Sequence, residues 1–278
     1  MKLGITPLSP TIGAEIEGVD ITRPLDNEAF NAVHQALLEH LVLVIRDQSL
    51  DDDALMTLGK SFSSLVIHPF LQPNTDNPEV VAIYREPGDT SIVGEDWHAD
   101  TTHIATPPMG AVLHALETPP KGGDTIFANQ YAAYNALSDG MKKLLEGLNA
   151  VHDDTEVAGP NSKKNKTRTN KVRDDPNWRP TSSIHPVVRT HPETGRKCLF
   201  VNRSYSHCFE NMTRAESQPL MSFLQEQGNR PEFTCRVHWD PGTTVIWDNR
   251  CMKHIAVNDV TDHRRVMHRV QMTGDKPV

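Results

Sequence analysis

The sequence predicts a mainly β protein with flanking helices, built on a double-stranded β-helix, the cupin-like jelly roll. Short strand-like runs follow one another between residues 79 and 272, and only a few helical patterns interrupt them. No internal repeat and no Gly/Ser-rich or Pro-rich linker divides the 278 residues, a length that can bury a sizeable core. We therefore expect one domain over residues 1–278 whose interior can hold a ligand.

The N-terminal part predicts two helices on either side of a strand. Apolar residues recur at helical spacing from Phe30 to Leu41, and the apolar run 42–45 that follows is typical of a short buried strand. A second helix is expected after residues 51–53, because three consecutive aspartates are well placed to cap and stabilise a helix N-terminus.

The remainder predicts strands with two further helices. The strands are expected at residues 79–84, 110–116, 125–128, 186–190, 197–202, 234–239, 243–248 and 265–272. Residues 192–195, PETG, form a hairpin turn between two of them. The helices are expected near 136–148 and 213–227. In the latter, Thr213 and Glu216 have capping-box spacing, while Pro219 favours a start as late as Ser217.

Residues 153–183 differ from the rest of the chain. They contain many charges of both signs and few apolar residues, so we expect them to add little to the core. Two interpretations stay open for this segment. It is either a solvated loop or a lid over an active site, since long loops inside compact domains are often functional.

Composition limits the possible partners and the cellular compartment. The net charge of −8 argues against nucleic acid and leaves room for a small anion in a local basic pocket. No apolar run is long enough for a membrane span, and the N-terminus has no apolar signal core. Four cysteines without a C-x-x-C motif indicate reduced thiols. We expect a cytoplasmic protein without nucleic-acid or membrane partners.

Histidine spacing suggests a metal site. His98 and Asp100 have the H-x-D spacing that places two side chains on one face of a strand, but residues 152/154 and 238/240 share that spacing. His152 borders the charged segment and His238 precedes a turn, so both are interpreted as surface or structural residues. The downstream His254 follows a predicted strand and favours the pair at 98/100.

Two arginines share a face of the last predicted strand. Arg265 and Arg269 lie four residues apart, and strand side chains repeat every two residues. Two guanidinium groups on one face repel each other unless each meets an anion. Surface salt bridges are one explanation, and two anionic ligands in one pocket are the other.

Several motifs together resemble the taurine dioxygenases, which are iron(II)- and 2-oxoglutarate-dependent oxygenases. They are GEDWHADT at 94–101, GGDT at 122–125, IWDNR at 246–250, RRVMHR at 264–269 and GDKP at 274–277. The resemblance runs nearly end to end and is interrupted mainly at 154–183. Residues 84–86, 93–97 and 233–237 are also similar to the aryloxyalkanoate dioxygenases of the same superfamily.

The resemblance implies a set of site residues. It makes His98, Asp100 and His254 the Fe(II) ligands, in the arrangement known as the 2-His-1-carboxylate facial triad. It makes Thr125 and Arg265 the contacts of the distal carboxylate of 2-oxoglutarate, which with O2 is a cosubstrate. The implied reaction hydroxylates the carbon beside a sulfonate and releases sulfite and an aldehyde.

The resemblance also implies where the substrate binds. His68 and Arg269 match the sulfonate-binding pair, and an aromatic side chain of the pocket persists at Tyr205. Three positions depart from the family pattern, where Leu71 replaces a Tyr, Gly94 an Asn and Ala158 a Phe. These changes predict a wider, more apolar pocket and an acidic substrate larger than taurine.

Alternatives to a sulfonate dioxygenase stay open. An aryloxyalkanoate or alkyl sulfate dioxygenase would belong to the same superfamily, and a non-catalytic protein that binds a metal or a small acid could use the same fold. The joint presence of Thr125, Arg265 and a complete ligand set favours the enzyme. The family resemblance suggests a homodimer or homotetramer.

Overall fold

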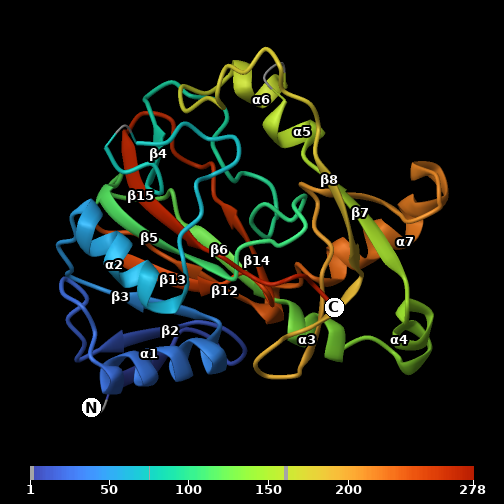
Figure 1. Ribbon diagram of the computed structural model, residues 1–278, viewed down its shortest axis with the longest axis horizontal. Coiled ribbons are helices and arrows are strands. Elements are labelled where there is room, and N and C mark those ends of the chain that lie inside the picture. The colour runs from blue at the N-terminus through green and yellow to red at the C-terminus, as the bar shows by residue number, and fades with distance from the viewer. Residues whose placement is uncertain (1–2, 75, 160–161) are drawn as a thin grey trace.

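Two β-sheets face each other across the main core, as expected for a jelly roll (Figure 1). The computed structural model describes residues 3–74, 76–159 and 162–278. The larger sheet has seven strands in the order β1-β2-β3-β13-β5-β15-β4, and the smaller sheet has the order β12-β6-β14. The predicted fold class, mainly β with helices outside, is confirmed.

Strand alternation decides what each face of the larger sheet covers. Its strands are β1 (Gly4–Pro7), β2 (Ala14–Glu17), β3 (Val42–Ile45), β4 (Val81–Arg85), β5 (Gly110–Glu117), β13 (Thr244–Asp248) and β15 (Arg265–Met272). In β13, Val245 and Trp247 belong to the core between the sheets, while Ile246 belongs to a second core on the outer face. Successive side chains of a strand point to opposite faces, which explains the two cores.

The smaller sheet closes the other side of the main core. Its strands are β6 (Thr125–Asn129), β12 (Thr234–Val237) and β14 (Met252–Ala256), and β6 pairs antiparallel with both neighbours. Phe127, Val237 and Met252 pack into the core from this sheet. Register places His254 opposite Phe127 and Ala256 opposite Thr125, so one end of the sheet carries two of the predicted site residues.

Two helices cover the outer face of the larger sheet (Figure 1). They are α1 (Asn27–His40) and α2 (Asp52–Phe62). The carboxylate of Asp26 accepts a hydrogen bond from the Ala29 N–H, and that of Asp51 accepts one from the Ala54 N–H, each at 2.8 Å. The predicted cap within 51–53 is therefore confirmed at Asp51.

A third apolar cluster lies among helices and strands outside the two main sheets. These are α3 (Gln130–Asn135), α4 (Asp139–Leu145), α7 (Arg214–Gln227), the 3-10 helix η1 (Pro231–Phe233), β7 (Asn149–Asp153), β8 (Ser182–Pro186), β9 (Val188–Thr190), β10 (Lys197–Leu199) and β11 (Ser206–Phe209). The helix expected near 136–148 is confirmed as α4 but is shorter, because Ser138 caps it through the Met141 N–H, and α3 before it was not predicted. A start of α7 at Ser217 is wrong, because the Thr213–Glu216 capping box fixes the first turn upstream of Pro219.

The segment 153–183 is more ordered than its composition indicates. It contains α5 (Thr155–Ala158) and α6 (Lys163–Lys166), and its residues 160–161 lie outside the described part of the chain. Ala158 and Val172 belong to the main core, and Val172 forms an isolated β-bridge with Leu71. The segment thus adds few buried apolar residues to the core, as expected, but those few attach it to the main core.

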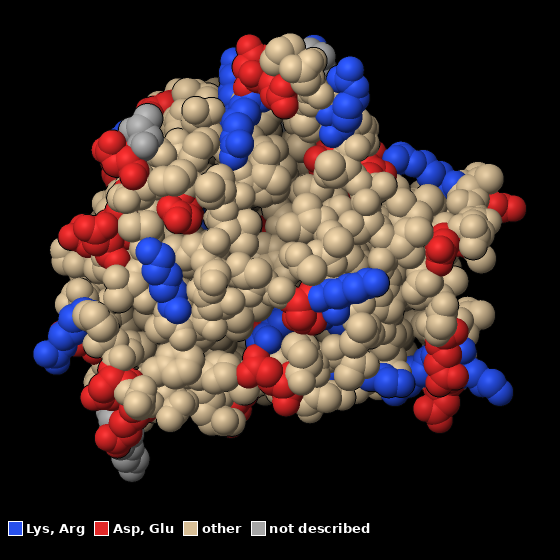
Figure 2. All heavy atoms as spheres, in the orientation of Figure 1, with Lys and Arg blue, Asp and Glu red and all other residues tan. Residues whose placement is uncertain are grey.

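The surface carries charges of both signs. Figure 2 shows Lys and Arg side chains interspersed with Asp and Glu over the face in view. Within the described ranges, no helix is long and apolar enough to cross a membrane.

Candidate active site

Three side chains with metal-binding atoms meet at one end of the smaller sheet. His98 and His254 form an isolated β-bridge. The backbone N–H of His98 donates to the carbonyl oxygen of His254 with an N to O distance of 3.0 Å, and that of His254 donates to His98 at 2.7 Å. Their ring centroids lie 4.1 Å apart, and the His98 Nε2 lies 3.6 Å from the Asp100 Oδ1. One nitrogen or oxygen of each of the three side chains lies within 4.8 Å of the others. The structure thus brings together residues that are 156 positions apart.

Their surroundings fit a bound divalent metal. The His98 Nδ1 lies 2.8 Å from the Asp96 carbonyl oxygen, which makes Nδ1 the donor and leaves the Nε2 lone pair facing Asp100. Asp100 Oδ2 and His254 Nδ1 are buried without a hydrogen-bond partner. Such atoms are costly to bury unless a ligand satisfies them. Two imidazoles and one carboxylate are a donor set that suits Fe(II).

The protonation states favour metal binding as well. Burial raises the pKa of Asp100, but the nearby Arg269 guanidinium, His98 and His254 outweigh it and hold that pKa well below the usual value. Burial lowers the pKa of His254 well below its usual value. Asp100 is therefore anionic and His254 neutral, the forms in which these groups bind metals.

Arg265 and Thr125 lie in a cavity beside His254. The cavity is also lined by His98, Phe127 and Trp247. The guanidinium of Arg265 lies over the Trp239 ring at 5.6 Å, and the Trp239 Nε1 donates to the Thr125 Oγ1 at 3.0 Å. Burial lowers the pKa of Arg265 to about 10, and its Nε has no partner. A carboxylate bound here would face a fork of donors and a hydroxyl group.

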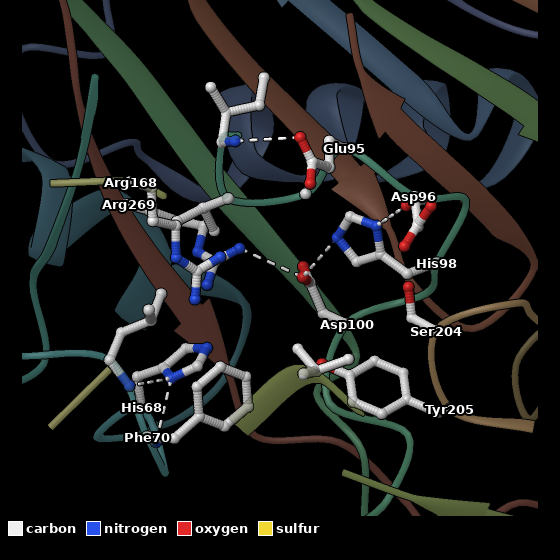
Figure 3. Close-up of a pocket in the computed structure, with 15 residues that line it drawn as sticks. His68, Phe70, Glu95, Asp96, His98, Asp100, Arg168, Ser204, Tyr205 and Arg269 are labelled. Carbon is white, nitrogen blue, oxygen red and sulfur yellow. Dashed lines mark hydrogen bonds and ion pairs between the residues drawn. The ribbon is translucent and has the colours of Figure 1, made fainter. Parts of the chain in front are cut away.

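An adjoining pocket contains the predicted substrate contacts (Figure 3). The Nδ1 of His68 accepts hydrogen bonds from the N–H groups of Phe70 and Leu71 at 3.3 and 3.0 Å, so Nε2 carries the proton of the neutral ring. Burial lowers the pKa of His68 well below its usual value. Arg269 is 4% exposed and its Nη1 donates to the Asp100 Oδ1 at 3.1 Å, which rules out a surface salt bridge as its role.

Known proteins share this chain's sequence and fold over nearly its whole length. The sequence model of the family described as "Taurine catabolism dioxygenase TauD, TfdA family" matches residues 4–271. The chain belongs to this family. It is therefore a 2-oxoglutarate-dependent dioxygenase, an oxidoreductase that uses Fe(II), 2-oxoglutarate and O2.

Individual relatives cover almost all of this dioxygenase. It is 34% identical to an alkylsulfatase of Acinetobacter baylyi, over 99% of this chain and 86% of the relative. It is 32% identical to an alpha-ketoglutarate-dependent sulfate ester dioxygenase of Pseudomonas putida, over 100% of this chain and 92% of the relative. The crystal structure of a putative taurine dioxygenase from Burkholderia xenovorans superposes with a TM-score of 0.84 at 32% identity, over 100% of this chain and 94% of the other.

The positions that depart from the family pattern do not all line the pocket of the dioxygenase. Leu71 and Gly94 line it, as does the predicted aromatic Tyr205, whereas Ala158 lies in the main core outside the pocket and its neighbour Val157 lines the pocket instead. Gly94 has a φ of +83°, and a Cβ there would come within 3.2 Å of the His98 Cε1. A larger side chain at 94 would therefore strain the backbone and press on His98.

The other two H-x-D pairs of the dioxygenase do not assemble a metal site in the described residues. His152 is fully buried and its Nδ1 lies 2.9 Å from the Thr102 Oγ1, so it is structural. His238 is half-exposed, and its Nδ1 lies 2.9 Å from the Asp124 Oδ1. A second cluster of His191, Asp248 and Cys251 lies elsewhere, but both Asp248 oxygens already accept hydrogen bonds from arginine or histidine.

Sequence reasoning missed Arg168, which lines the same pocket as His68 and Arg269. It lies in the charged segment 153–183, where the composition predicts that an arginine side chain is exposed to solvent. The only available signal was the possibility that this segment covers an active site.

Proposed function

We propose that this dioxygenase hydroxylates the carbon that bears a sulfonate or sulfate ester group, on a substrate longer than taurine. The observation that carries the proposal is an anion pocket, formed by His68 and Arg269, that opens directly beside Asp100. Hydroxylation at that carbon releases sulfite from a sulfonate, or sulfate from a sulfate ester, and leaves an aldehyde. Fe(II) with 2-oxoglutarate and O2 supplies the oxidising chemistry when bound.

In this proposal, His98, Asp100 and His254 hold Fe(II), as their convergent and partly unpartnered atoms suggest. Arg265 and Thr125 hold the distal carboxylate of 2-oxoglutarate in the cavity next to His254. The arginine fork donates two parallel hydrogen bonds, which fixes the orientation of a carboxylate as well as binding it.

The substrate's anionic group lies against Arg269 and His68. The Asp100 carboxylate holds the Arg269 guanidinium in place, and two backbone N–H groups fix the ring of His68 so that its Nε2–H is the free donor. Because Arg269 bonds to Asp100, one of the proposed Fe(II) ligands, an anion bound to Arg269 would have its neighbouring carbon on the side of the pocket where the metal would be held. This position accounts for attack at the carbon next to the anion.

The apolar wall of the pocket supports a substrate longer than taurine. Phe70, Leu71 and Val157 line it, and Leu71 stands where taurine dioxygenases have a Tyr. An ammonium group left unpaired in such a place costs several kcal/mol, whereas each buried methylene gains about 0.8 kcal/mol. Relatives that act on sulfate esters, at 32 to 34% identity, support the same substrate class.

Four further proposals concern the whole chain. We propose that residues 1–278 form a single domain in which segment 153–183 acts as a lid, a role supported by Val157 and Arg168 in the pocket wall. We propose a cytoplasmic protein that forms a homodimer or homotetramer, which light scattering would show. We also propose that it binds neither nucleic acid nor membranes, in line with its net charge of −8.

A product screen tests the proposed function. The enzyme is incubated with Fe(II), 2-oxoglutarate and air, and with taurine, 1-hexanesulfonate, hexyl sulfate or phenoxypropionate. Succinate, sulfite, sulfate and aldehyde are all quantified. We expect hexanesulfonate or hexyl sulfate to show the highest kcat/KM, and Leu71→Tyr to shift the preference toward taurine. A preference for taurine in the unmodified enzyme contradicts the size argument, and turnover of phenoxypropionate alone contradicts the substrate class.

A further inference from the structure

The pocket contains a second guanidinium group, besides that of Arg269, that the proposed function leaves unused. Arg168 lies between α6 and β8, in segment 153–183, and is only 5% exposed. It lines the same pocket as His68 and Arg269. In Figure 3 these three residues lie on one side of the pocket, and His98 and Tyr205 lie on the other.

The guanidinium of Arg168 is buried without enough partners. Its Nε and one Nη have no hydrogen bond and are shielded from solvent. Nearby Arg173, in contrast, donates to the carbonyl oxygens of Leu71 and His68. Burying a cation that lacks hydrogen bonds is unfavourable unless an anion meets it. Burial lowers the pKa of Arg168, although the Glu95 carboxylate and Tyr205 counteract this effect.

Hydrogen bonds of the two residues after Arg168 fix the backbone beside it, which sets the position of its side chain. The Thr169 N–H and hydroxyl both donate to the Asp89 Oδ1 at 2.9 Å. The Asn170 Nδ2 donates to the carbonyl oxygen of Ala82, in β4, at 3.2 Å. Thr169 and Asn170 thus attach the segment to β4 of the larger sheet and to the loop after β4. These bonds place Arg168 in the pocket wall.

We propose that Arg168 is a third donor to the substrate's anionic group and selects a sulfonate or sulfate over a carboxylate. This inference rests on the proposed function and deepens it. A sulfonate or sulfate ester has three terminal oxygens, whereas a carboxylate has two. Three donors on one side of the pocket can each meet one of these three oxygens, namely the His68 Nε2–H and the guanidinium groups of Arg269 and Arg168 (Figure 3). Each carboxylate oxygen can accept more than one hydrogen bond, but the two oxygens lie in one plane, so donors from three segments fit the three-oxygen pyramid of a sulfonate or sulfate better.

The existing bond of Arg269 strengthens the need for a further donor. One Nη of Arg269 already donates to the Asp100 Oδ1, so only part of its fork faces the substrate. Arg168 lies on a different segment from Arg269 and His68, so each of the three donors can approach a different oxygen of a tetrahedral anionic group. Substrate binding would then also hold segment 153–183 against the barrel.

Substitution of Arg168 tests this selectivity. The probes are 1-hexanesulfonate, hexyl sulfate and heptanoate, which share a similar tail and differ in the acid group. For Arg168→Ala we expect KM for both sulfur acids to rise at least about tenfold, the loss of a charge-assisted contact, with a change below about threefold for heptanoate. Arg168→Lys keeps the positive charge without the forked guanidinium donors, so its KM for the two sulfur acids should lie between those of the unmodified enzyme and Arg168→Ala. KM for 2-oxoglutarate should stay unchanged.

Arg179→Ala is the matched control. Arg179 lies in the same segment, is exposed, and donates to the carbonyl oxygen of Trp178 at 2.8 Å. Equal KM values for Arg168→Ala and the unmodified enzyme overturn the proposal, as does an equal rise for all three acids. Calorimetric titration of the Mn(II)-loaded protein with hexanesulfonate keeps the test independent of turnover. If the unmodified enzyme binds hexanesulfonate but releases no sulfite, the proposed function fails while the Arg168 contact is still measured.

Discussion

At the residue scale, the site is defined by side chains whose free atoms point to one place. His98 has one nitrogen bonded to the Asp96 carbonyl oxygen and the other facing Asp100. Asp100 in turn has one oxygen near Arg269 and the other without a partner. Each residue thus keeps one atom for a ligand while the second atom fixes its orientation.

The ligand assignment predicts a sharp difference among the histidines. His98→Ala or His254→Ala should abolish succinate formation and bound metal, because each removes one of three ligands. His238→Ala should leave both unchanged, since this residue is half-exposed and bonds only to acidic side chains. His152→Ala should lower stability instead, because the ring is fully buried against Phe200. Metal content and activity per folded protein are measured, and loss of metal in His152→Ala but not in His98→Ala contradicts the assignment.

The two arginines of β15 should separate by ligand. Arg265→Ala should raise KM for 2-oxoglutarate and Arg269→Ala should raise KM for the acidic substrate, each by at least about tenfold, as expected for a lost charge-assisted contact. Because Arg269 also bonds to Asp100, the assays are run at saturating Fe(II) with metal content recorded. Steady-state kinetics with one ligand varied at a time measures both KM values. If both substitutions raise both KM values equally, the assignment of one arginine to each ligand is contradicted.

At the element scale, a buried ion network joins the end of β13 to the hairpin between β9 and β10. Asp248 accepts hydrogen bonds from Arg250 at 2.9 and 2.7 Å and from His191 at 2.9 Å. Arg250 also donates to Glu193 of the hairpin at 2.6 Å. This network fixes the turn that leads into β14, the strand that carries His254.

Removing Asp248 should therefore destabilise the protein. Asp248→Ala leaves Arg250 buried without its main partner, and we expect a loss of about 3 to 5 kcal/mol in the free energy of unfolding. Burial raises the pKa of Asp248, but the bonds from Arg250 and His191 outweigh it and lower the pKa below its usual 3.8. The stabilisation is thus present above pH 3.8 and is lost as the pH falls toward the depressed folded-state value.

Urea denaturation at several pH values checks this expectation. The exposed Asp262→Ala is the control and should leave the free energy of unfolding essentially unchanged. If Asp248→Ala lowers the free energy of unfolding by less than about 1 kcal/mol at pH 7, the prediction is contradicted, and the ion network adds little to stability.

At the scale of the whole molecule, metal binding should be coupled to folding. His98 and Asp100 precede β5, while His254 lies in β14, so the site exists only when the barrel is closed. A ligand that binds only the folded state at about 100 times its Kd stabilises it by about 2.7 kcal/mol, which should raise Tm by roughly 5 to 10 °C. Calorimetric scans with Mn(II) measure the rise. It should vanish in His254→Ala and after chelation, and an equal rise in His254→Ala places the metal elsewhere.

Much of the barrel follows from local patterns. The strands at 42–45 and 265–272 have the predicted bounds. The two-residue period of the second strand explains why Met267 lies in the core while its neighbour His268 bonds to Asp52 on the outer face. The capping box of α7 is likewise a local signal that the structure confirms. These features depend on side chains within a few residues of one another, which a sequence shows directly.

The sequence by itself determined the fold class, the family and the candidate ligands, because periodicity and ordered motifs are properties of the chain. Only the tertiary structure decided which groups are buried together. It placed Ala158 in the main core outside the pocket, which Val157 lines instead. It also brought Arg168 into the pocket through bonds of its neighbours to Asp89 and Ala82. A charged composition shows that a segment can be exposed to solvent. Whether a given side chain of that segment is buried is decided by contacts between residues 80 or more positions apart, which the local sequence does not show.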